Sequence, residues 1–115
     1  MNTLVKQSRL NNKDAELLND AMASQLIFTA DFCRENQFIQ FHGSGDMIGI
    51  SEVHLTNSGY QIDMGHLANI ERISSKYISV YTFTMGQRVT AKISVNSIIE
   101  QYKDKTYGNH FANTI

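Results

Sequence analysis

The sequence predicts an α+β domain in which a long N-terminal helix packs on a mainly antiparallel sheet of about five strands, closed by a short C-terminal helix. Three observations support this. Apolar residues recur at helical spacing between residues 13 and 35, short runs rich in β-branched and aromatic residues follow up to residue 95, and Ser97 and Glu100 have capping-box spacing. A chain of 115 residues fits a single domain, 1–115, with one core.

The N-terminal part of the chain is predicted to be a short tail followed by the long helix over 13–35. Residues 1–11 show no period and are predicted to be a loosely held tail. Asn12 can cap a helix over 13–35, because Asp14 then lies in the first turn, where a carboxylate favours the helix dipole. The apolar stripe of this helix is formed by Leu18, Met22, Leu26 and Phe32.

The middle of the chain is predicted to form three strands. Residues 37–42 are followed by the break Gly-Ser-Gly-Asp at 43–46, a second strand over 48–55 and a third over 60–64. The segment 65–75 is ambiguous, since apolar residues three apart suit a short helix or a 3₁₀ turn but do not exclude a strand.

The stretch Tyr77–Val95 is predicted to form a β-hairpin. We expect a type II′ turn at Gly86-Gln87, because the first central position of that turn needs a positive φ. Met85 would then pair with Arg88, Val80 with Ile93 and Ile78 with Val95, which directs the even-numbered residues of the first strand toward the core.

The opposite face of this hairpin is unusually aromatic for a solvent face. It carries Tyr77, Tyr81, Phe83, Arg88 and Lys92. Three explanations are open: a helix of the same chain covers these residues, a partner protein or second copy does, or the bases of a single-stranded nucleic acid stack on them.

The C-terminal segment is expected to be a helix over about 97–106, ended by Gly108, with a short tail over 109–115. A net charge of -1 gives no overall bias toward nucleic acid. Cys33 is the only cysteine, which excludes an internal disulfide, and no stretch has the roughly 20 apolar residues of a membrane span. We therefore expect a cytoplasmic protein.

The turn containing His42, Ser44 and Asp46 is the most enzyme-like segment. It lacks the strand-to-helix G-x-S-x-G elbow of a nucleophilic serine, so a simple turn is the favoured interpretation and an enzyme the less favoured one. His42, His54 and His66, with Asp63, are the conceivable metal ligands. Exposed or hydrogen-bonded histidines are the preferred explanation, and we expect no metal or cofactor.

The stretch FHGSGDMIGISEV resembles an F-x-G-S-G-D-x-G-x-I segment of small uncharacterised proteins carried by phages and plasmids. The resemblance covers about 13 residues, departs from the pattern at Met47-Ile48 and implies no known activity. It implies an accessory protein of a mobile element.

Taken together, these features favour a small protein-binding module that acts on a host protein, for example as an inhibitor, through Tyr77, Tyr81, Phe83, Arg88 and Lys92. A second copy of the chain is an alternative partner. The alternative functions are a small ligand-binding protein or hydrolase that uses His42, Ser44 and Asp46, and a nucleic-acid binder that uses the hairpin face.

Overall fold

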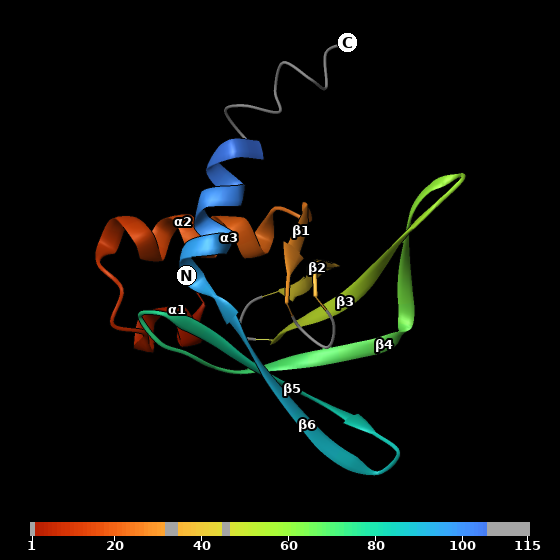
Figure 1. The fold of residues 1–115 in the computed structure, drawn as a ribbon. Helices are drawn as coiled ribbons and strands as arrows, with labels where there is room; N and C mark the ends of the chain where they lie inside the picture. The colour runs from red at the N-terminus through yellow and green to blue at the C-terminus, as the bar shows by residue number, and fades with distance from the viewer. Residues whose placement is uncertain (1, 32–34, 45–46, 106–115) are drawn as a thin grey trace.

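The computed structural model describes residues 2–31, 35–44 and 47–105, and the side chains of these except at 44 and 63–67 (Figure 1). The described residues form three helices and one six-stranded antiparallel sheet in which consecutive strands are neighbours. The elements are α1 (Thr3–Gln7), α2 (Asn12–Ala23), β1 (Ile27–Ala30), β2 (Gln37–Ser44), β3 (Met47–Thr56), β4 (Gly59–Ile73), β5 (Tyr77–Thr84), β6 (Gln87–Ser94) and α3 (Val95–Lys103). No described helix is long and apolar enough to cross a bilayer.

The predicted long helix over 13–35 is wrong. Helix α2 has 12 residues and ends at Ala23, and Gln25 then takes a positive φ of 60°. A left-handed residue just after a helix is a common way to end it, but glycine is the usual signal, and here the residue is glutamine.

Residues placed in that helix instead form the edge strand β1. Phe28 pairs with Ile39 of β2, and its ring meets Phe41 edge-on at 5.8 Å between centroids. The free edge of β1 is also satisfied, since the Gln101 side chain of α3 accepts from the Thr29 N–H at 2.8 Å and donates to the Thr29 carbonyl at 2.7 Å. Tertiary pairing therefore overrides the helical spacing, and the sheet has six strands rather than about five.

The first eleven residues, expected to be a tail, contain helix α1. The Asn2 side chain caps it by accepting from the N–H groups of Leu4 and Val5, at 2.8 and 3.3 Å. Val5 is buried in the core. The predicted tail at 109–115 lies outside the described residues.

Strand β4 resolves the ambiguous segment 65–75 as mainly strand. It runs to Ile73, with register shifts opposite Ser51/Glu52 and at Ile70/Arg72. These irregularities break the strict alternation of side chains, which explains why the segment shows no clear strand period. At the C-terminus, α3 begins two residues earlier than predicted, and the Ser94 side chain caps it by accepting from the Ser97 N–H at 3.1 Å.

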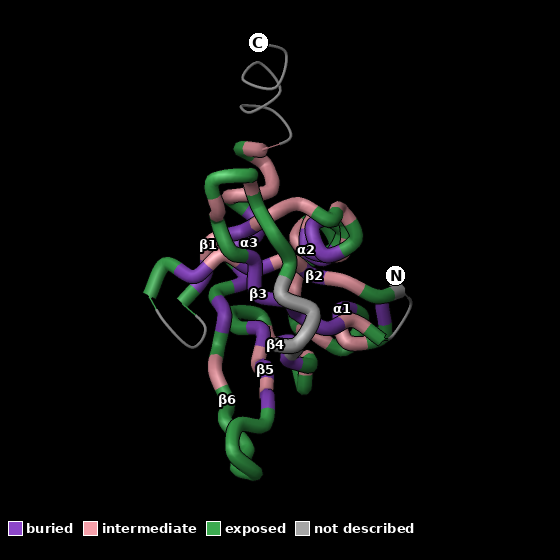
Figure 2. Tube along the Cα trace, turned by 90° about the vertical axis from the view of Figure 1, so that its right-hand side faces the viewer, coloured by how far each residue is buried: buried purple, intermediate pink, exposed green. Residues whose placement is uncertain are grey.

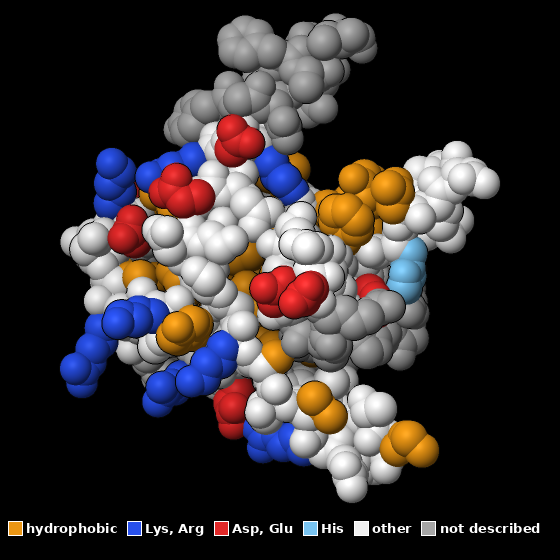
Figure 3. Space-filling view, viewed as in Figure 1, with side chains coloured by type: hydrophobic (Ala, Val, Ile, Leu, Met, Phe, Trp, Pro, Cys, Tyr) orange, Lys and Arg blue, Asp and Glu red, His pale blue; other side chains and the backbone are white. Residues whose placement is uncertain are grey.

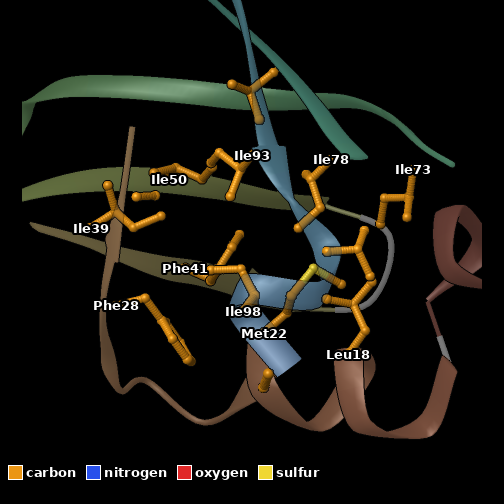
Figure 4. Close-up of a cluster of buried hydrophobic side chains, with 14 of the residues drawn as sticks. Leu18, Met22, Phe28, Ile39, Phe41, Ile50, Ile73, Ile78, Ile93 and Ile98 are labelled. Carbon is orange, nitrogen blue, oxygen red and sulfur yellow. The ribbon is translucent and has the colours of Figure 1, made fainter. Parts of the chain in front are cut away.

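The core lies between one face of the sheet and the helices. Leu18 and Met22 of α2 and Ile98 of α3 point toward Ile39, Phe41, Ile50, Ile78 and Ile93 of the strands (Figure 4). All of these side chains are buried. The other face of the sheet has no described helix against it, and it carries the residues considered next.

The β5–β6 hairpin is present as predicted, but its turn differs. The central residues are Met85 and Gly86, with φ of 52° and 77°, as in a type I′ turn, and Thr84 pairs with Gln87. Ile78 therefore lies opposite Ile93 rather than Val95. Because the pairing moves by two positions, each residue keeps its predicted face.

Candidate protein-binding face

The aromatic strip, defined as Tyr77, Tyr81, Phe83, Arg88 and Lys92, lies on the face of β5 and β6 that points away from the helices. Along β5, the even-numbered Ile78, Val80 and Thr82 are buried. Phe83 is 66% exposed and Tyr77 44% exposed, and Tyr81 is partly buried between them. Figure 2 shows exposure increasing toward the hairpin tip, which projects away from the helices. Within the described part of the chain, the strip is not covered.

Contacts among the strip residues hold their side chains in place. The rings of Tyr81 and Phe83 meet edge-on, with centroids 6.1 Å apart. The Arg88 guanidinium lies 4.4 Å from the centroid of the Tyr81 ring, and the Lys92 ammonium lies 5.4 Å from that of Tyr77. These are cation–π distances, so each cation shields one ring face from water.

Glu71 of β4 completes the strip, although the sequence did not single it out. Its carboxylate accepts from the Arg88 guanidinium at 2.5 Å, and both side chains are about half exposed. Glu71 lies at the register shift of β4, where the strand period is lost. Alternation along the strand therefore gives no signal in the sequence that places Glu71 on this face.

One row of residues connects the strip to the middle of the sheet. His42, Gly49, Asn69 and Tyr81 are successive Cα partners across β2, β3, β4 and β5. Gly49 has no side chain, and a hollow of about 260 Å³ is lined there by residues that include all four. A Cβ on Gly49 would lie 3.3 Å from His42 Nε2 and 3.0 Å from the Ala68 carbonyl oxygen, so this row depends on glycine.

Of the three side chains in the enzyme-like turn, only that of His42 is described. His42 lies on β2, and its Nε2 is buried without a hydrogen-bond partner among the described residues. The Ser44 side chain and Asp46 lie outside the described residues.

The two candidate metal ligands whose side chains are described, His42 and His54, do not lie close together. His54 is an exposed residue of β3 whose Nδ1 lies 3.9 Å from Glu52, and alternation places it on the opposite face of the sheet from His42. The side chains of His66 and Asp63 are not described. Among the side chains that are described, no three His, Cys, Asp or Glu residues cluster.

A second exposed apolar group, which the sequence reasoning missed, lies on the β3–β4 hairpin. Leu55 is 62% exposed, Tyr60 and Ile62 are also exposed, and the Tyr60 ring meets Phe38 edge-on at 5.5 Å. Figure 3 shows hydrophobic side chains gathered beside this hairpin. In contrast to the aromatic strip, no cation–π contact is made by this group within the described residues.

No family model, curated protein or solved structure matches the chain. Its resemblance to phage and plasmid proteins stays a prediction for the same reason. Of the exposed surface groups, the aromatic strip combines the largest number of aromatic and cationic contacts among the described residues.

Proposed function

We propose that the chain is a protein-binding module whose contact surface is the aromatic strip. The observation that carries this proposal is the exposure of Phe83 and Tyr77 on a sheet face with no described element against it. Aromatic residues and arginine are enriched among the residues that dominate binding energy, and a contiguous exposed group of them is typical of an interaction site.

The contacts within the strip favour binding because they order it before a partner arrives. Tyr81 is held by Phe83 on its edge and by Arg88 over its face, and Glu71 fixes Arg88. Side chains that are already ordered lose less conformational entropy when a complex forms. The rings are also carried by paired strands rather than by a loop, which limits backbone rearrangement.

The charges of the strip indicate the chemistry of the partner. Two cations, Arg88 and Lys92, stand against the single carboxylate of Glu71. A partner surface with an apolar centre and carboxylates at its rim would be complementary. In this proposal the partner is a host protein met in the cytosol, as the sequence resemblance and the single cysteine suggest.

Nucleic acid is the second candidate, because exposed tyrosines beside cations also suit stacked bases and phosphates. Two observations make it the weaker one. The cations lie over the faces of Tyr81 and Tyr77, where bases would have to stack, and Arg88 is already neutralised by Glu71.

The test compares three immobilised proteins in host lysate: the wild type, Tyr81→Ser with Phe83→Ser, and Leu55→Ser. Leu55 is a matched control because it is 62% exposed, against 66% for Phe83, but lies outside the strip. A protein retained by the wild type and the control, and weakened about 30-fold or more for the double variant, supports the proposal.

Circular dichroism first establishes that the double variant is folded. Retention that is equal for all three proteins would overturn the proposal. Retained material that nuclease treatment releases would favour the nucleic-acid function, and concentration-dependent dimerisation lost in the double variant would identify a second copy as the partner.

A further inference from the structure

We infer that a pocket between α1 and the β4–β5 turn is a binding site for a phosphate group, separate from the aromatic strip. The pocket has a volume of about 420 Å³, within the range of small-molecule sites. Its lining consists of Leu4, Gln7, Arg9, Arg72, Ile73, Ser74 and Ser75.

The two arginines carry the inference. Arg9 follows the end of α1 and Arg72 lies next to the end of β4, so two segments distant in sequence each contribute an exposed arginine to the lining of one pocket. Neither Arg9 nor Arg72 has an ion-pair or hydrogen-bond partner among the described residues, in contrast to Arg88, which pairs with Glu71. Two guanidinium groups without a carboxylate partner are suited to a ligand that brings the negative charge.

The surroundings of the pocket support the same charge preference. Figure 3 shows Lys and Arg side chains gathered over α1 and the neighbouring turn between β4 and β5. Among the described residues that line the pocket there is no Asp or Glu. An oxyanion would therefore meet a local excess of positive charge despite the net charge of -1 of the whole chain.

The turn that forms one wall is ordered by Ser74. Its hydroxyl oxygen accepts from the N–H groups of Lys76 and Tyr77, at 3.3 and 3.0 Å, and donates to the Tyr77 carbonyl at 3.3 Å. Ser75 and Gln7 add neutral donors to the lining, and Leu4 and Ile73 add an apolar part. The apolar part lies beside the arginines, so the ligand class that we propose is a phosphorylated small molecule whose organic group contacts Leu4 and Ile73.

The test is a titration of the ¹⁵N-labelled protein with inorganic phosphate and, separately, with phenyl phosphate, at constant ionic strength. We expect saturable shifts of the Arg9 and Arg72 side-chain N–H signals and of the Ser74 and Ser75 amides. Arg9→Gln and Arg72→Gln should each weaken binding about tenfold or more, since a charge-assisted hydrogen-bond pair is removed. Lys13→Gln, an exposed site on α2, should not change it.

The two probes separate the sources of the phosphate group. Tighter binding of phenyl phosphate supports a phosphorylated organic molecule, and equal binding supports inorganic phosphate. Shifts that do not saturate, or an equal loss of affinity in Arg9→Gln and Lys13→Gln, would show general screening and overturn the site. Arg9 lies between α1 and α2, outside the sheet, so Arg9→Gln is expected to fold. It therefore still tests the site if Arg72→Gln does not fold.

Discussion

The two faces of the β5–β6 hairpin are held in place by different means, although their residues alternate along the same eight-residue strand. On one face, Ile78 and Val80 are completely buried under the helices. On the other, Tyr81 and Phe83 are ordered by each other and by Arg88. The comparison teaches that a face can be ordered without being covered, and only such a face is available to a partner.

The largest difference should appear when one residue from each face is shortened to alanine. Ile78→Ala removes a fully buried side chain beneath α2 and α3, and should lower the free energy of unfolding by about 2–5 kcal/mol. Phe83→Ala, at a residue that is 66% exposed, should lower it by less than about 1 kcal/mol. Urea denaturation followed by circular dichroism measures both, and equal losses would show that the strip belongs to the core.

A smaller effect is expected at Gly49, where two neighbouring groups lie close to the position that a Cβ would take. Gly49→Ala would bring a methyl group to 3.0 Å from the Ala68 carbonyl oxygen and 3.3 Å from His42 Nε2. We expect a loss of about 1–3 kcal/mol in the free energy of unfolding, as for an overpacked site. If the histidine ring is what must yield, the double variant with His42→Ala should recover part of this loss. No recovery would assign the strain to the Ala68 carbonyl.

A still smaller effect is expected for the ion pair on the strip. Arg88→Gln removes the contact with the Glu71 carboxylate and the cation over Tyr81. Both charged side chains are about half exposed, so the cost to stability should be no more than about 1 kcal/mol and should decrease with added salt. Thermal unfolding at low and high salt measures it, with Lys13→Gln, an exposed site on α2, as the control for a general charge effect. A loss that salt does not reduce would contradict a solvent-screened pair.

Much of the sheet could be predicted from the sequence because its signals are local. The turn residues around 57–59 and 85–87 and the alternation in β5 identify strands and faces without knowledge of the rest of the chain. These signals suffice for the strip as well, since its five residues follow from the alternation of one hairpin.

The end of α2 and the strand β1 could not be predicted in the same way, because long-range pairing determines them. Leu26 and Phe28 extend the apolar stripe of α2, and only the pairing of Phe28 with Ile39 shows that the helix has ended and that Phe28 belongs to strand β1. Glu71 and the Arg9–Arg72 pocket were missed for a related reason. Each depends on the irregular strand β4, where two register shifts remove the period that sequence reasoning uses.

The smallest expected effect concerns the tip, where the two faces of the hairpin meet. Met85 has a φ of 52° and its side chain is 97% exposed, so it adopts a strained left-handed conformation and buries almost nothing. Asparagine tolerates this conformation far better, and Asn-Gly is the preferred pair for a type I′ turn. Met85→Asn should therefore raise the free energy of unfolding by about 0.5 kcal/mol, measured by urea denaturation, whereas Met85→Val should lower it. A neutral or reversed order would mean that the turn is not type I′, and the pairing of Thr84 with Gln87 would then be in question.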